Sequence, residues 1–183
     1  MKIIEQILNG VLILEPKIFN DDRGYFYESF STAFFNDQGI IADFVQDNQS
    51  FSHNGALRGL HFQNPPFAQG KLVRVIQGKV LDVVVDIRKG SPTFGKHFSA
   101  ELSASNHLQM WIPPGFAHGF ATLEDETIFC YKCTNVYNKA AEGGLFWNDK
   151  TLNIDWKIEN PIISVKDAIL PSFNTLESQF IFP

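Results

Sequence analysis

Short apolar segments separated by turn residues run through most of the chain. In residues 79–88 every odd position from 81 to 87 is apolar, whereas Asp82 and Asp86 lie on the alternate positions. Successive side chains of a strand point to opposite faces, so this pattern predicts a strand with one apolar core face and one mixed face. Gly78 before it and Gly90 after it indicate tight turns at both ends.

The same criteria predict most of the remaining elements. Further strands are expected at 11–14, 25–30, 44–51, 57–63, 71–77, 97–103, 107–112, 116–122 and 126–137. One short helix is expected to begin after Ser31 or Thr32 and to end at Gly39. Short strands at this spacing, with Gly and Pro turns and no long amphipathic helix, are typical of a β-sandwich or barrel.

The chain is expected to form one domain. Its 183 residues, of which 44% are hydrophobic, suit a single domain with a sizeable core. The pattern is less regular after about residue 143, so we predict a barrel core of about 11–140 and a covering segment of about 141–183 packed on it. The 18 Phe residues favour a β core filled by rings.

Charge and cysteine content limit the kinds of partner and the cellular compartment that we expect for this chain. The formal net charge is -5, and no long Lys/Arg block is present, so nucleic acid and membrane surfaces are poor candidates for partners. Glu5 and Asn9 interrupt the sequence before the apolar run 11–14, so we predict neither a signal peptide nor a membrane span. Cys130 and Cys133 would point to opposite faces of a strand, and free thiols favour a reducing, cytoplasmic setting.

The segment Arg58-Gly59-Leu60-His61 and the nearby Lys71 carry the main candidates for chemistry. A fixed cation, an imidazole and an ammonium suit a site that holds an anion and moves a proton beside a developing negative charge. The alternative is a half-buried strand histidine with solvated edge charges. Simple alternation places Arg58 and His61 on opposite faces, unless Gly59 marks a β-bulge that re-aims them.

Metal and nucleophile chemistry fit the sequence poorly. The segment from Pro113 to His118 resembles the second half of the cupin metal motif, but His61 is followed by Phe62-Gln63 and no suitably placed Glu. No G-x-S-x-G elbow or Gly-rich phosphate loop occurs. Acid–base chemistry therefore remains, with no metal expected.

Five side chains are candidates for that acid–base chemistry. His61 can accept a proton at neutral pH, and either Asp82 or Asp167 could orient it; spacing does not choose between them. Tyr131 can donate a proton if a nearby cation lowers its pKa, although a core aromatic with a bonded hydroxyl is an alternative. Lys71 could stabilise an enolate oxygen.

A series of motifs resembles the dTDP-4-dehydrorhamnose 3,5-epimerase family. The resemblance runs from about Asp21 to Pro171, with Trp156-Lys157 in place of an expected Trp-Pro. In chain order the motifs are Arg58-Gly59-Leu60-His61-Phe62-Gln63, Gln69-Gly70-Lys71-Leu72-Val73-Arg74-Val75, Gly90-Ser91-Pro92-Thr93-Phe94-Gly95, Ile112-Pro113-Pro114-Gly115-Phe116-Ala117-His118-Gly119-Phe120, Tyr131-Lys132-Cys133-Thr134, Glu142-Gly143-Gly144, Trp147-Asn148-Asp149 and Ser164-Val165-Lys166-Asp167.

The resemblance implies an all-β, cupin-type jelly roll with a few short peripheral helices, a homodimer, and no metal or organic cofactor. It implies a dTDP-4-keto-6-deoxy-hexose substrate whose C3 and C5 protons are removed and returned on the opposite face. It assigns His61 as the base, Tyr131 as the acid, Asp167 as the carboxylate that orients His61, and Lys71 as the group facing the enolate. The positions that match nucleotide- or sugar-binding residues are Arg23, Glu28, Gln46, Asn48, Arg58, Lys71, His118, Glu142 and Lys166.

The sequence leaves other functions open. Related cupins epimerise only C3 or only C5, or isomerise the keto sugar. A metal-dependent cupin and a non-catalytic sugar-nucleotide binder are rivals from other classes.

Overall fold

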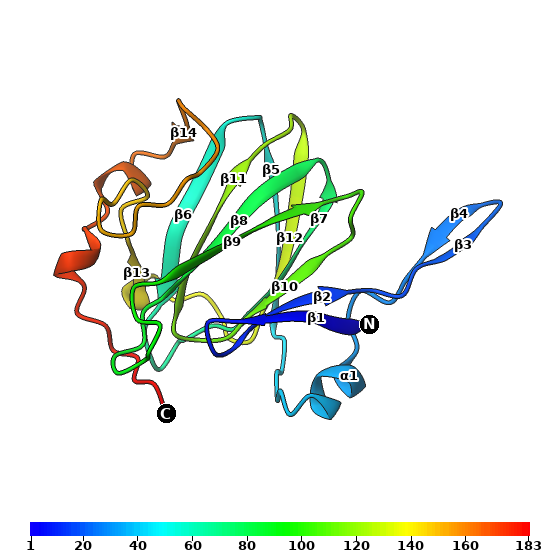
Figure 1. Cartoon of the computed structure of the whole chain (residues 1–183), viewed down its shortest axis with the longest axis horizontal. Coiled ribbons are helices and arrows are strands. Elements are labelled where there is room, and N and C mark those ends of the chain that lie inside the picture. Colours follow the sequence, from blue (N-terminus) through cyan, green and yellow to red (C-terminus); the bar gives the residue numbers. More distant parts are fainter.

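Two antiparallel sheets face each other in the computed structural model, which describes all residues 1–183 (Figure 1). The first sheet has, in spatial order, β1 (Lys2–Ile7), β2 (Val11–Glu15), β10 (Gln109–Ile112), β7 (Lys71–Gln77), β12 (Thr127–Cys133) and β5 (Gln46–Ser52). The second has β13 (Glu142–Gly144), β6 (Ala56–Gln63), β11 (Phe116–Thr122), β8 (Lys79–Asp86) and β9 (His97–Ser103), with β14 (Ile162–Ile163) added in parallel beside β6. This is the all-β, cupin-type jelly roll that the sequence predicted.

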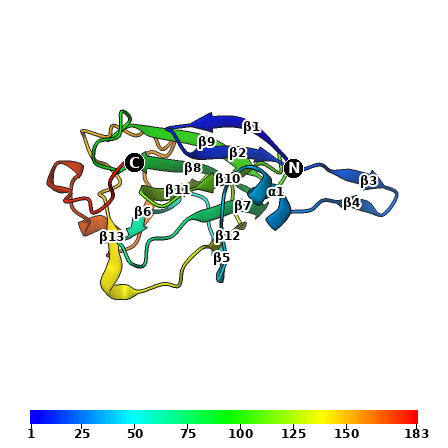
Figure 2. The same cartoon turned by 90° about the horizontal axis from the view of Figure 1, so that it is seen from below.

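The remaining elements are short and peripheral. A hairpin of β3 (Phe19–Asp21) and β4 (Gly24–Phe26) projects from the body (Figures 1 and 2). Helix α1 (Thr32–Asp37) begins as predicted, because the Ser31 hydroxyl accepts a hydrogen bond from the backbone of Phe34 at 3.4 Å. Three single-turn 3₁₀ helices complete the chain: η1 (Lys139–Ala141), η2 (Asp167–Ile169) and η3 (Phe173–Thr175).

The predicted strands are found, two of them shorter than expected, and the short strands β3, β13 and β14 as well as β1 were not predicted. Strand β1 was not predicted, because as an edge strand it has mostly exposed side chains and so lacks the alternation of a half-buried strand. The strand expected at 25–30 is shorter, and the one expected at 126–137 ends at Cys133. None of the helices is long and apolar enough to cross a membrane.

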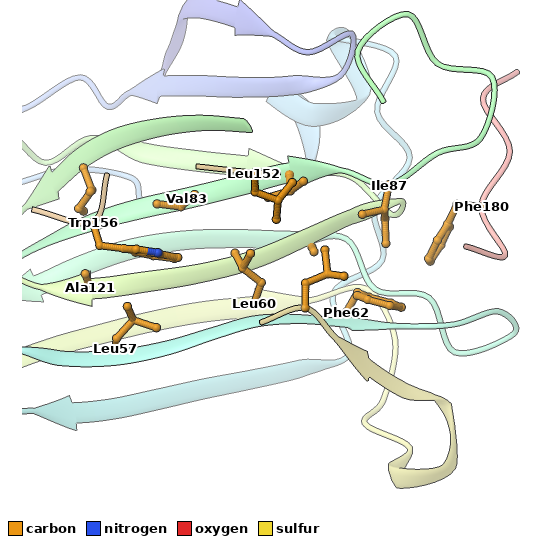
Figure 3. Packing of buried hydrophobic residues seen from close by; sticks show 13 residues of the cluster. Leu57, Leu60, Phe62, Val83, Ile87, Ala121, Leu152, Trp156 and Phe180 are labelled. Atoms are coloured by element: carbon orange, nitrogen blue, oxygen red, sulfur yellow. The ribbon is translucent and has the colours of Figure 1, made fainter. Parts of the chain in front are cut away.

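Both faces of β8 are buried, each in a different core. Its apolar face packs beneath the covering segment (residues 141–183), where Leu152, Trp156 and Phe180 lie against the sheet (Figure 3). Its mixed face points between the two sheets, and there Val80 and Val84 contact the second core. The carboxylates on that face, which an apolar interior would disfavour, are therefore inside the sandwich and need partners.

A β-bulge at Gly59 distorts the pairing of β6 with β11. His61 pairs with His118 and Arg58 pairs with Phe120, so three residue steps on β6 oppose two on β11. A Cβ on Gly59 would lie 2.5 Å from the Gly119 Cα, and φ is +134° there. Only glycine fits this close approach of two backbones, and the bulge turns both Arg58 and His61 toward one cavity.

We expect Gly59→Ala to lower the free energy of unfolding by about 3 kcal/mol or more, because the methyl group meets backbone atoms that cannot move aside. Gly90→Ala is the matched control: its φ is +82° but nothing lies within 4 Å of the added Cβ, so about 1 kcal/mol of backbone strain is expected. Urea denaturation of the three proteins measures the difference. Equal losses in the two variants would contradict the close-approach argument.

Candidate active site

A cavity of about 540 Å³ opens at the edge of the sandwich between the two sheets and the covering segment. A second cavity of about 300 Å³ adjoins it and shares three of its lining residues: His61, Lys71 and Tyr131. The candidate site residues that line one or both cavities are Gln46, Asn48, Arg58, His61, Lys71, His118, Tyr131, Glu142, Lys166 and Asp167. The fold thus brings together all of the predicted site residues except Arg23 and Glu28.

His61 is paired with Asp167, which comes from the covering segment. His61 Nε2 lies 2.6 Å from Asp167 Oδ1, and the backbone N–H of Gly59 donates to Oδ2 at 3.3 Å. The backbone N–H of Asp167 in turn donates to the Ser164 hydroxyl at 3.1 Å, which anchors this turn of the segment. Of the two carboxylates that the sequence left open for His61, the structure pairs the imidazole with Asp167.

The Asp167 carboxyl is held in its ionised form. Burial by itself raises its pKa, but hydrogen bonds from His61, Gly59 and Ser164, together with the charge on His61, outweigh burial and lower the pKa below its ordinary value of 3.8. A buried carboxylate that stays ionised can orient the imidazole and stabilise its protonated form.

Asp82, the other candidate partner, contacts a different histidine. His118 Nε2 lies 3.0 and 3.1 Å from its two carboxylate oxygens. Both residues are on neighbouring strands, β11 and β8, and face the space between the sheets. The site therefore contains two imidazole–carboxylate pairs, and the Cα atoms of His61 and His118 are partners across β6 and β11.

Lys71 and Tyr131 lie next to each other on β7 and β12. The Lys71 ammonium is 5.8 Å from the centre of the Tyr131 ring and forms no ion pair. Burial lowers the pKa of Lys71, while the surrounding Cys133, Asp82 and Glu142 act in the opposite direction. An ammonium without a carboxylate partner in a cavity is free to pair with negative charge on a ligand.

The pKa of Tyr131 is not lowered overall, although a cation lies nearby. Burial raises this pKa above its ordinary value and Cys133 adds to the increase, whereas Arg58 lowers it by less. The phenol therefore stays protonated at neutral pH, as a proton donor requires.

Two further groups of polar contacts shape the cavity walls. Arg58 Nε donates to the Ser52 hydroxyl at 3.2 Å, and Arg58 Nη2 donates to the Phe51 carbonyl at 3.3 Å. At the rim, Lys166 forms an ion pair with Glu142, which also accepts a hydrogen bond of 3.0 Å from the Tyr137 hydroxyl. These contacts fix the direction of two cations that border the cavity.

Sequence reasoning missed Ser52, Tyr137 and Ser164. One signal could have found Ser52: the inward-facing positions of β5, residues 46, 48, 50 and 52, are all polar where a sandwich strand usually has core residues. Gln46 and Asn48 in this stripe are bonded to each other at 3.0 Å. A polar stripe on a core-facing side indicates a wall of a site.

Arg23 and Glu28 are not brought to the cavity of their own chain. Arg23 lies in the projecting β3–β4 hairpin, where its guanidinium pairs with Asp21 at 2.6 Å and its side chain is 90% exposed. Glu28 lies just after the hairpin and forms no ion pair or hydrogen bond. Figures 1 and 2 show the hairpin pointing away from the covering segment that borders the cavity.

The two cysteine thiols do not form a disulfide and lie on opposite faces of β12. Cys130 and Cys133 are both free thiols; Cys133 is fully buried near Asn48, and Cys130 contacts Gln49 on the outer side. No group of three or more His, Cys, Asp or Glu side chains is arranged to hold a metal ion.

A cupin-type barrel whose cavity joins a carboxylate-paired imidazole, a protonated phenol and unpaired cations has the groups of a sugar-nucleotide epimerase. The sequence profile of the family described as dTDP-4-dehydrorhamnose 3,5-epimerase matches residues 5–175. An enzyme of that name from Shigella flexneri is 54% identical over 168 residues, which are 91% of this chain and 93% of the relative. The chain therefore belongs to the dTDP-4-dehydrorhamnose 3,5-epimerase family and is an isomerase.

Solved structures of relatives support the same assignment. The dTDP-4-dehydrorhamnose 3,5-epimerase of Bacillus anthracis, with TDP and PPi bound, is 48% identical and superposes with a TM-score of 0.92 over 94% of this chain and 99% of its own. The 3,5-epimerase of Legionella pneumophila, in complex with dTDP-4-keto-L-rhamnose, is 47% identical, with a TM-score of 0.92 over 96% of this chain and 94% of its own.

The Asp167 contact predicts a specific pH dependence of stability. Because the carboxyl has a lower pKa in the folded chain than its ordinary 3.8, its stabilisation is full above that value and is lost as the pH falls through the folded pKa. We expect the wild type to be more stable than Asp167→Asn near pH 6, and the gap to shrink at pH 3. Urea denaturation at the two pH values measures it. A gap of constant size would contradict the pairing.

Proposed function

We propose that the chain converts dTDP-4-dehydro-6-deoxy-D-glucose to dTDP-4-dehydro-L-rhamnose by epimerisation at C3 and C5, without a metal or organic cofactor. The observation that carries the proposal is the His61–Asp167 pair beside Tyr131 and Lys71 in one cavity of a chain of this family. We place the reaction in the cytoplasm, in the supply of dTDP-L-rhamnose for surface polysaccharide.

His61 is the base in this proposal. Asp167 occupies Nε2, so Nδ1 is the nitrogen that accepts the proton from the carbon next to the C4 ketone. The electron pair of the broken C–H bond forms the enolate, whose negative oxygen the Lys71 ammonium stabilises. Asp167 stabilises the imidazolium that results, because an ionised carboxylate close to it favours the charged form.

Tyr131 is the acid. It donates its hydroxyl proton to the same carbon on the opposite face, which inverts the centre and restores the C4 ketone. The phenolate then recovers a proton and His61 releases one, so each carbon exchanges one hydrogen with solvent and the substrate is neither oxidised nor reduced. The second carbon repeats these steps.

Two cations suit the dTDP part of the substrate. Arg58 and Lys166 lie at the cavity wall and rim, and a guanidinium held by Ser52 is well suited to a diphosphate oxygen pair. Converging cations explain how a chain with a net charge of -5 can bind a dianion. Gln46, Asn48, His118 and Glu142 are available to the nucleotide and sugar.

We also propose that the functional unit is a homodimer in which each hairpin completes the site of the other copy. The hairpin carries exposed Phe19, Tyr25 and Phe26, and apolar surface of this kind favours burial against a partner. Arg23 and Glu28 match binding positions of the family but lie away from their own cavity, which a contribution across the dimer would explain.

Incubation of dTDP-4-keto-6-deoxyglucose with the protein in D₂O should place deuterium at both C3 and C5, measured by NMR. His61→Ala should reduce the rate of labelling by about 10²–10⁴-fold if it removes the general base. His53→Ala, at an exposed histidine paired with Asp125, is the matched control and should label at the wild-type rate.

Each other result of the labelling experiment would indicate a different function. Label at one carbon only would indicate a mono-epimerase, and binding without label would indicate a sugar-nucleotide binder. Loss of labelling after chelation, restored by added metal, would indicate a metal-dependent cupin. Full activity in His61→Ala would remove this residue from the mechanism.

Mixing two inactive variants tests the contribution across the dimer. We expect Arg23→Ala and His61→Ala to be weakly active alone and, after subunit exchange at equal amounts, to regain about a quarter of wild-type activity, because each mixed dimer has one intact site. Activity is measured before and after exchange. A mixture no more active than its two components would contradict a shared site.

A further inference from the structure

The second imidazole–carboxylate pair, His118 and Asp82, has no role in the proton transfers described above. Its geometry is nonetheless closely defined, because Nε2 lies 3.0 and 3.1 Å from the two oxygens of one carboxylate. The Asp82 side chain has no exposed surface, and the imidazole is its only hydrogen-bond partner. A buried carboxylate with a single partner is stable only if that partner donates a hydrogen bond to it.

This requirement fixes which ring nitrogen of His118 carries the proton. An ionised carboxylate only accepts hydrogen bonds, so the ring nitrogen that faces both of its oxygens has to be the one with the proton. Burial lowers the pKa of His118, although Asp82 acts in the opposite direction, so the ring holds one proton at neutral pH. With that proton on Nε2, the other nitrogen, Nδ1, is an acceptor.

The surroundings of the ring favour the same state. Three charged or titratable groups face it: Asp82 from β8, His61 from β6 and Lys71 from β7. A second proton on His118 would put another positive charge beside Lys71 and a protonated His61. Asp82 can hold the single proton on Nε2, the nitrogen that faces it, without the ring becoming a cation.

We propose that Asp82 is a positioning residue that keeps the proton of His118 on Nε2, so that Nδ1 accepts a hydrogen bond from a hydroxyl group of the bound sugar nucleotide. This inference rests on the proposed function for the ligand, but its statement about the tautomer concerns the chain alone. An amide at position 82 could not impose this choice, because its oxygen accepts and its nitrogen donates, so either tautomer would be satisfied.

Asp86 provides a matched control for a purely structural role. It lies four residues further along the same strand, on the same inward face, and is equally buried. Its partners are Arg88, Ser91 and Thr93, at distances of 2.6 to 2.9 Å, and it does not line the cavity. Asp86→Asn therefore disturbs a buried carboxylate of the same strand without touching His118.

The tautomer can be measured on the wild-type protein without substrate. In ¹⁵N-histidine-labelled protein near pH 7, with the His118 signals assigned from a His118→Asn spectrum, we expect a protonated Nε2 and an unprotonated Nδ1. A proton on Nδ1, or a doubly protonated ring, would overturn the proposal. This measurement does not depend on whether the Asp82 variants fold or on whether the substrate is correct.

Kinetics of variants then test the consequence for the reaction. We expect Asp82→Asn to lower kcat/KM about 10- to 100-fold, as for loss of a well-aligned hydrogen bond to substrate, and to alter the His118 ¹⁵N signals. Asp86→Asn should lower Tm but keep kcat/KM and those signals at wild-type values. A similar loss of kcat/KM in both variants would indicate that burial of the charge alone matters.

A double-mutant cycle separates action through His118 from an independent effect. If Asp82 acts only by setting the His118 ring, Asp82→Asn should cost no more than about twofold in the His118→Asn background. Multiplicative losses would overturn the proposal. A wild-type protein that labels no substrate in D₂O would contradict the proposed function instead, and the tautomer result would still stand.

Discussion

The contact between His61 and Asp167 is the interaction on which the site depends. It joins a strand of the second sheet to a turn that lies 106 residues later in the chain. Asp167 is nearly fully buried there, and the three hydrogen bonds at its carboxyl and backbone are what make an ionised group acceptable in that position. Removing the imidazole would leave a buried charge unpaired, so the two residues constrain each other.

A second constraint lies in the backbone and sets the direction of the same imidazole. Gly59 and Gly119 approach so closely that neither position has room for a Cβ. The bulge that results places Arg58 and His61 on the same side of β6, against the alternation of a regular strand. An imidazole and a guanidinium that border one cavity thus come from one strand because of a local irregularity in its pairing.

Much of the fold was predictable from the sequence because sandwich strands with a buried face leave a period-2 pattern. Strand β1 left none, since its side chains are mostly exposed, and it was missed. For the site, residue types and motif order identified the cavity-lining groups. Spacing alone did not choose between Asp82 and Asp167, because the choice depends on how the covering segment lies on the sheet; the family resemblance pointed to Asp167. The raised pKa of Tyr131 was not predictable for a related reason: burial outweighs the neighbouring cation, and burial is a tertiary property.

The covering segment seals the apolar face of the second sheet and also supplies Glu142, Lys166 and Asp167 to the site. A ribosome makes these residues after strands β1 to β12. A nascent chain that has already folded its strands therefore exposes His61 without the carboxylate that orients it, and Arg58 without the rim formed by Lys166. The groups of the proposed site therefore come together only after residues 142–167 have been made, and a shorter fragment would present His61 without its carboxylate.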